Sequence, residues 1–190
     1  MFALMRHTRT FPSSTTGDSN ATFNVVIAYE DFETGKHARQ LYDFLAEHLA
    51  DECRFGVQMW KFDVLSVSKL RQMAARDAAD AEIIIVSAHG RADLPPEVKA
   101  WADLWLHESK RTIALVALFD AQEYLENPAR SSLAGLARCA GVEFFAQPGL
   151  WPSDGESKTA EGWDGTEGSF AVLTQRARRD RGLSHWGINE

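Results

Sequence analysis

The most constraining feature of this sequence is a short apolar run, Ala81–Gly90 (AEIIIVSAHG), that ends abruptly in serine, histidine and glycine. A continuous run of this length is typical of a strand buried on both faces of a parallel sheet. Two further runs have the same character, Phe23–Tyr29 (FNVVIAY) and Thr112–Phe119 (TIALVALF). Because strands covered on both faces need helices on both sides, the sequence predicts an α/β sandwich.

Shorter apolar segments and stretches with helical spacing complete the pattern. Phe55–Phe62 and Val142–Ala146 are predicted to be the second and fifth strands. The intervening stretches carry apolar faces at helical spacing, formed by Ala38, Leu41, Tyr42, Leu45 and Leu49; Leu70, Met73, Ala74 and Ala78; Val98, Trp101, Ala102 and Trp105; and Leu133, Leu136, Ala137 and Ala140. This alternation predicts a three-layer α/β sandwich with a five-stranded parallel sheet in the flavodoxin-like order 2-1-3-4-5.

Local residues suggest where the helices begin and end. Thr34-Gly35 leads into the first helix, after a polar loop. Ser66 or Ser68 is expected to cap the second helix, and Pro95-Pro96 starts the third. Ser131 or Ser132 is expected to cap the fourth, which Asn127-Pro128 separates from what precedes it and Gly141 ends.

Length and composition indicate one globular domain with tails. Of the 190 residues, 23–149 are assigned to the α/β domain, 1–22 to a disordered Ser/Thr-rich arm and 150–190 to a Trp/Gly-rich extension with a short helix. The net charge of -7 argues against a nucleic-acid partner. The two cysteines form no disulfide or metal motif, and no segment is long enough to span a membrane. We therefore expect a cytoplasmic protein.

The predicted topology gathers the residues that follow each strand at one edge of the sheet, where such folds bind ligands. We expect a ligand-binding site there, made by Glu30, Asp31, Phe32, Thr34, Gly35, Asp63, Ser87, His89, Gly90 and Asp120, with Gln147 after the last strand. Three or four of these carboxylates would suit Mg²⁺. Loop polarity and helix capping account for them without a metal, so no metal site is assigned.

Two sharper chemical interpretations apply to this edge. His89 has the right chemistry for an acid or base near neutral pH, but Ser87 lacks the glycine-flanked turn that exposes a hydrolase nucleophile. Thr34-Gly35-Lys36-His37 resembles a phosphate-binding loop at a helix start. However, acidic residues surround it and the first glycine of a P-loop is missing, so a simple helix start with glycine in the turn is the favoured interpretation.

Two stretches also resemble a known family. NVVIAYEDFETGKHARQLYDFLAEHL and LRQMAARDAADAEIIIVSAHGRADLPPEVKAWADLW are similar to blocks of TIR and SEFIR domains, over about Phe23 to Trp105. The resemblance implies self-association as an adaptor or, in some TIR domains, cleavage of NAD by a helix glutamate that follows a Trp-Cys pair. In this sequence Trp101 is followed by Ala102 in place of the cysteine, and Glu97 comes before Trp101 and not after it. Receiver domains are similar too, but Ser87 stands where their phosphoacceptor aspartate would be.

These observations favour a non-catalytic module that binds a protein partner or a small ligand at the strand-end edge, as a homo-oligomer. One alternative is a nucleotide-processing enzyme, such as an NAD hydrolase, that uses Glu97 or His89. Another is an FMN-binding protein. The sequence identifies no cofactor.

Overall fold

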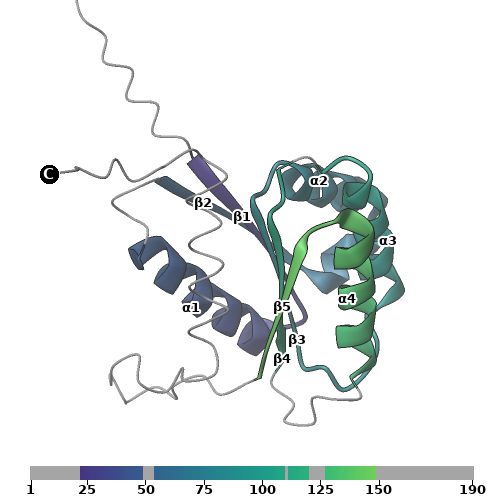
Figure 1. Cartoon of the computed structure of the whole chain (residues 1–190). Coiled ribbons are helices and arrows are strands. Elements are labelled where there is room, and N and C mark those ends of the chain that lie inside the picture. Colours follow the sequence, from purple (N-terminus) through teal and green to yellow (C-terminus); the bar gives the residue numbers. More distant parts are fainter. Residues whose placement is uncertain (1–21, 49–53, 110, 120–126, 149–190) are drawn as a thin grey trace, which may run out of the picture.

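A single parallel sheet forms the centre of the domain (Figure 1). The computed structural model describes residues 22–48, 54–109, 111–119 and 127–148. The strands are β1 (Thr22–Tyr29), β2 (Arg54–Lys61), β3 (Ile83–Ala88), β4 (Ala114–Phe119) and β5 (Glu143–Pro148). The helices are α1 (Phe32–His48), the 3₁₀ helix η1 (Phe62–Ser66), α2 (Ser68–Ala79), α3 (Pro96–Leu106) and α4 (Pro128–Ala140).

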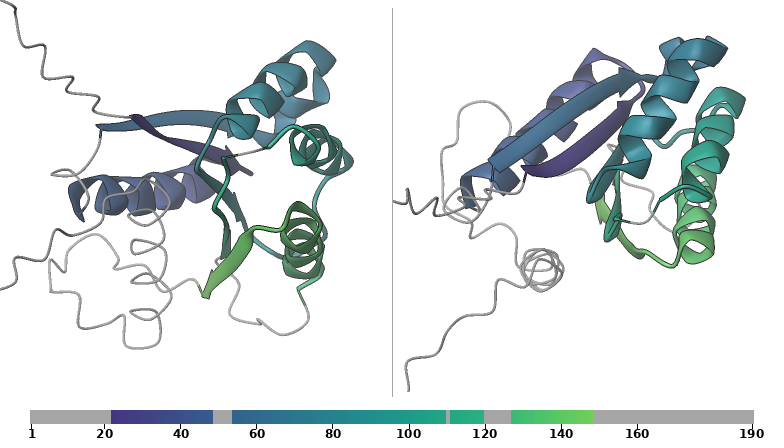
Figure 2. Two further views of the ribbon diagram at one scale, coloured as in Figure 1. Left: turned by 45° about the horizontal axis from the view of Figure 1, so that its top comes forward. Right: turned by 90° about the horizontal axis from the view of Figure 1, so that it is seen from above.

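The order of the strands confirms the predicted architecture. All neighbouring pairs are parallel, and the order is β2-β1-β3-β4-β5. Helix α1 covers one face of the sheet, while α2, α3 and α4 cover the other (Figures 1 and 2). The chain therefore forms a three-layer, flavodoxin-like α/β sandwich.

Successive residues of the central strands belong to two different hydrophobic cores. Ile83 and Ile85 pack on the side of α1, whereas Ile84 and Val86 pack on the side of α2, α3 and α4. All six residues of β3 are buried, as are all six of β4. This two-sided burial explains why the runs show no polar alternation. The edge strand β2 is only half-buried, as its partly alternating sequence indicates.

Helix α1 begins earlier than the sequence suggests, and α2 begins without a serine cap. Phe32 and Glu33 already belong to α1, because Asp31 caps it. The N-cap of α2 is Val67, whose side chain makes no capping bond. Ser66 instead closes η1, an element the sequence did not reveal, by donating to Asp63 O at 2.6 Å.

Two further expectations about helices α2 and α4 are wrong. Met73 is 45% exposed, because the buried stripe of α2 runs through Ala74, Ala75 and Ala78. Helix α4 is capped by Asn127, whose Oδ1 accepts hydrogen bonds from the amides of Ala129 and Arg130. Asn127-Pro128 is therefore the start of this helix. Gly141 ends it at φ 68°, as expected.

The remaining expectations about the chain ends concern residues outside the described ranges. The predicted extension over 150–190 lies there completely, as does the predicted arm apart from Thr22, the first residue of β1.

The cap of α4 gives a direct test of this local structure. Asn127→Ala removes two hydrogen bonds at a buried helix start, and we expect the free energy of unfolding to fall by about 1–2 kcal/mol. Ser131→Ala, at an exposed position of the same helix, should change it by less than about 0.5 kcal/mol. Urea unfolding of both variants measures the difference. Equal losses in the two variants would contradict the assignment of Asn127 as the cap.

Candidate functional site

The carboxyl ends of β1 and β3 are joined by four hydrogen bonds, which we call the β1–β3 clamp. The amide of Glu30 donates to Ser87 O at 3.0 Å, and Ser87 Oγ donates to Thr34 O at 2.8 Å. The amide of His89 donates to Glu30 Oε2 at 2.8 Å, and its ring Nε2 lies 2.7 Å from Asp31 Oδ2. The clamp uses most of the polar groups that the sequence places after these two strands.

Asp31 is both part of the clamp and the cap of α1. Its Oδ1 accepts from the Thr34 amide at 3.0 Å, while Thr34 Oγ1 accepts from the Asp31 amide at 2.8 Å. This reciprocal pair is a capping box at the start of the helix. The bond from the Thr34 amide, followed by that from His89, lowers the pKa of Asp31 from 3.8 to about 2. The carboxylate is thus held ionised at the amino end of α1.

This arrangement leaves no phosphate cradle between β1 and α1. Only Glu30 and Asp31 connect the two elements, and the Asp31 carboxylate occupies the helix end where an anion would bind. Thr34 is 1% exposed and engaged with Asp31. A Cβ at Gly35 would lie 2.8 Å from the Tyr29 ring, so this glycine allows close packing of helix on strand.

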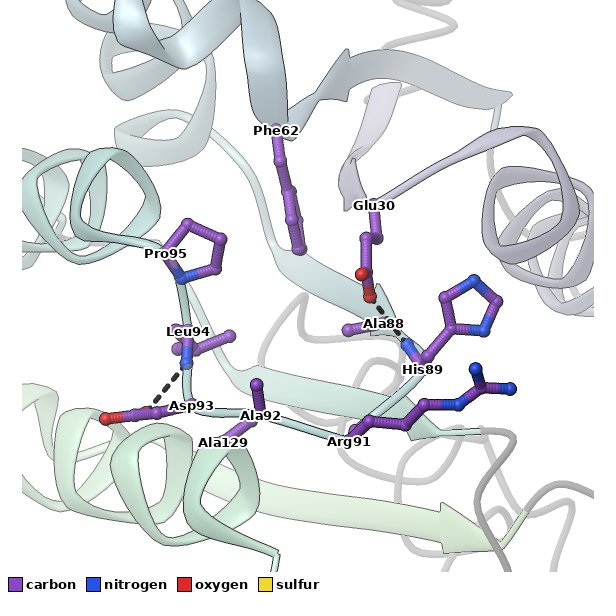
Figure 3. A pocket seen from close by; sticks show the side chains of 11 residues that line it. Glu30, Phe62, Ala88, His89, Arg91, Ala92, Asp93, Leu94, Pro95 and Ala129 are labelled. Carbon is purple, nitrogen blue, oxygen red and sulfur yellow. Dashed lines mark hydrogen bonds between the residues drawn. The ribbon is translucent and has the colours of Figure 1, made fainter.

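A pocket of about 220 Å³ lies beside the clamp, at the point where the strand order reverses between β1 and β3. Figure 3 shows the segment that follows β3 running around it, with Glu30 and Phe62 opposite. Ligands of open α/β sheets bind at such a switch point. The lining consists of Glu30, Phe62, Ala88, His89, Gly90, Arg91, Ala92, Asp93, Leu94, Pro95 and Ala129.

Gly90 gives this segment its turn. Its φ of 73° lies in the left-handed region, and a Cβ there would lie 2.3 Å from Asn127 Nδ2 and 2.9 Å from the Phe119 ring. The glycine is therefore required both by the backbone conformation and by the space available.

Asp93 fastens the other end of the segment to two helices. One oxygen accepts from Ser132 Oγ of α4 at 2.8 Å and from the Leu94 amide at 2.7 Å; the other lies 2.5 Å from Lys99 Nζ of α3. Lys99 and then Ser132 lower the pKa of this carboxyl below its usual value. Figure 3 shows the Asp93 carboxylate pointing away from Glu30. Its charge is therefore balanced outside the pocket.

The structure brings together only part of the predicted site. Glu30, His89 and Gly90 line the pocket, whereas Ser87 is 2% exposed behind it, with its hydroxyl bonded to Thr34. Burial and this bond leave Ser87 unsuited to act as a nucleophile. His89 presents its ring to Asp31.

The other predicted residues are spread around this edge. Phe32 is 77% exposed, and Asp63 pairs with Lys61 at 2.7 Å in η1. Glu97 is in the first turn of α3, and the pocket lining does not include it. Asp120 and the side chain of Gln147 fall outside the described residues. Over the ranges that the structure describes, no three histidine, cysteine or acidic side chains come together as a metal site.

Several pocket residues are absent from the sequence prediction. Phe62 comes from η1 and Ala129 from α4, so only the folded chain brings them to the end of β3. A signal existed for the segment 89–95, because Pro95-Pro96 delays the start of α3 and leaves a loop after β3.

Known proteins resemble this chain in fold and only weakly in sequence. No protein-family model matches the chain, and no curated protein matches it significantly. Among solved structures, a flavodoxin of Streptococcus pneumonia TIGR4 is similar, with 18% identity, a TM-score of 0.44 and coverage of 69% of this chain and 88% of that one. The flavodoxin-like domain of a Synechococcus sp. protein has 16% identity, a TM-score of 0.44 and coverage of 82% and 99%. The fold assignment rests on the strand order itself.

The part of the chain that the structure describes contains no candidate membrane span. None of its helices is long and apolar enough to cross a bilayer.

The turn at Gly90 leads to a prediction with an internal control. Gly90→Ala forces a side chain into contact with Asn127 and Phe119 at positive φ, so the free energy of unfolding should fall by about 3 kcal/mol. Gly135→Ala in α4 meets no atom within 4 Å and should raise it by about 0.5–1 kcal/mol. Thermal and urea unfolding measure both changes. A Gly90→Ala variant with the same free energy of unfolding as the unchanged protein would contradict the positive φ and the close contacts at this turn.

The clamp predicts a dependence of stability on pH. Because folding lowers the pKa of Asp31, its ionised form stabilises the fold above about pH 4, and this contribution is lost as the pH falls toward 2. Asp31→Asn keeps a capping oxygen but removes the charge. It should lower the free energy of unfolding by about 1 kcal/mol near neutral pH. The expected loss is modest because the Asp31 side chain is 45% exposed. Unfolding measurements between about pH 2 and 7 should show the two proteins converging at low pH. Glu33→Gln, at an exposed site in the same turn, should show a much smaller difference. A pH-independent gap between Asp31→Asn and the unchanged protein would contradict the role of the charge.

Proposed function

We propose that this protein is a non-catalytic binding module of flavodoxin-like fold, which holds a small ligand in the pocket at the switch point. The pocket beside Glu30 and the segment 89–95 carries this proposal. Its place in the topology is where such folds bind ligands. Its volume of about 220 Å³ is below the roughly 300–1,000 Å³ typical of pockets that enclose a drug-sized ligand, so the ligand is small or only one end of it is enclosed.

Binding of a small ligand has more support than docking of a partner. The large apolar side chains exposed among the described residues are distributed over β2 and the ends and outer faces of three helices. They are Phe32, Met59, Val67, Met73 and Leu104. Single exposed apolar residues are ordinary on soluble domains, whereas docking surfaces are contiguous patches.

The enzymatic alternative has less support from the same geometry. A TIR-type NAD hydrolase needs a glutamate at the substrate, and Glu97 is not among the residues that line the pocket. His89 keeps its Nε2 on Asp31. FMN binding is also disfavoured, because the Asp31 carboxylate occupies the helix end to which a phosphate would bind.

A fragment screen by NMR tests the proposal on the full chain. We expect at least one member of a chemically diverse library to shift the amide signals of His89–Asp93 in the ¹⁵N-labelled protein. The amides of Arg54–Gly56, at the start of β2 and therefore at the opposite edge of the sheet, should not shift. A library of which no member perturbs His89–Asp93 would overturn the proposal.

An activity assay separates the binding module from the enzyme. Incubation of the protein with NAD should release no nicotinamide above the rate of a buffer blank. Release that Glu97→Gln abolishes would replace the binding module with the hydrolase.

A further inference from the structure

The residues that line the pocket include an acceptor and several donors that have no partner in the described part of the chain. Glu30 Oε2 accepts from the His89 amide, and no hydrogen bond of the described residues uses Oε1. The next amides along the segment, those of Gly90, Arg91 and Ala92, likewise have no protein acceptor within the described part of the chain. Because Gly90 follows His89 directly, a free donor lies one residue from the group that holds Glu30. A ligand with an adjacent donor and acceptor would complement this edge.

The wall opposite this polar edge is aromatic and apolar. In Figure 3 the Phe62 ring reaches into the space between Glu30 and Pro95. Phe62 is 3% exposed and belongs to the core cluster on the side of α2 and α3, so its position is fixed by packing. Ala88, Leu94 and Ala129 complete the apolar surface. A flat ring bound here would contact this apolar wall.

The charges around the pocket disfavour an anion. The Glu30 carboxylate faces the space directly, as Figure 3 shows. Arg91 is exposed, and its side chain in Figure 3 runs away from Leu94 and Pro95. An anionic group next to Glu30 would be repelled at short range, whereas an N–H donor would make a charge-assisted hydrogen bond.

We propose that the pocket binds a purine base with an exocyclic amino group, of the adenine type. This inference rests on the proposed function and names its ligand class. The amino group donates to Glu30 Oε1, the adjacent ring nitrogen accepts from the main-chain amide of Gly90, and the ring lies against the apolar wall that includes Phe62. Adenine has such a donor and acceptor next to each other on one edge, namely the N6 amino group and the ring nitrogen N7. The volume of about 220 Å³ encloses a base, so the rest of a nucleotide would extend into solvent.

Matched compounds test the contacts from the side of the ligand. Titration of the ¹⁵N-labelled protein with adenine should shift the amides of Gly90 and Arg91. Purine, which has the same ring without the amino group, should bind about 10- to 100-fold more weakly, as expected for loss of a hydrogen bond to a charged acceptor. Inorganic phosphate should leave these signals unchanged. Equal affinities for adenine and purine, or binding of phosphate in place of adenine, would overturn the inference.

Matched variants test the same contacts from the side of the protein. Glu30→Gln should weaken adenine about tenfold, whereas Glu33→Gln, a glutamate outside the pocket lining, should leave the affinity unchanged. The NMR spectrum and melting temperature of each variant show whether it is folded. Unchanged affinity in a folded Glu30→Gln variant would overturn the inference.

The two proposals fail in different ways. If library fragments shift His89–Asp93 but adenine does not, the pocket is a ligand site and the ligand class is wrong. If adenine binds but lumiflavin binds more tightly, the site belongs to flavins. If no compound shifts these amides, the binding module itself is wrong.

Discussion

The clamp between the ends of β1 and β3 is the constraint on which the candidate site depends. Neighbouring parallel strands end side by side, but their loops are free to diverge beyond that point. Here Glu30, Ser87 and His89 exchange hydrogen bonds across the gap, so the two loops are fixed against each other. One wall of the pocket is therefore built from main chain and from a carboxylate whose position is set before any ligand arrives. Such preorganisation reduces the entropic cost of binding.

The same clamp separates this domain from phosphate-binding members of its fold. A helix start that binds phosphate offers unpaired amides to the anion. In α1 the Asp31 carboxylate accepts from the Thr34 amide and places a negative charge at the helix start, and the connection from β1 has only two residues. After β3, the amides of Gly90–Ala92 have no protein acceptor among the described residues, and Glu30 adds negative charge nearby. Asp31 at the first loop and Glu30 at the third therefore both disfavour an anion, which is the electrostatic basis for proposing a ligand that donates hydrogen bonds.

Much of the fold could be predicted because burial leaves a strong pattern in the sequence. The run Ile83–Val86 is apolar at every position because α1 covers one face of the sheet and three helices cover the other. Helix starts were harder, since serine, asparagine and aspartate all cap helices and the sequence offers several close together. Ser131 and Asn127 are both good caps in isolation. Asn127 is the cap in the folded chain, where its side chain is buried beside the Gly90 turn. This contact joins residues 37 positions apart, so the local sequence does not reveal it.

The candidate site was predictable only in its location. Topology places Glu30, His89 and Gly90 at one edge, and in the folded chain these three residues line one pocket. Topology could not reveal that Ser87 and Thr34 face each other rather than the solvent, because their orientation depends on how closely α1 approaches β3. That approach in turn depends on Gly35, which lets α1 pack against the Tyr29 ring. A glycine interpreted as part of a phosphate loop thus helps to close the first loop to ligands, and the pocket forms beside the third.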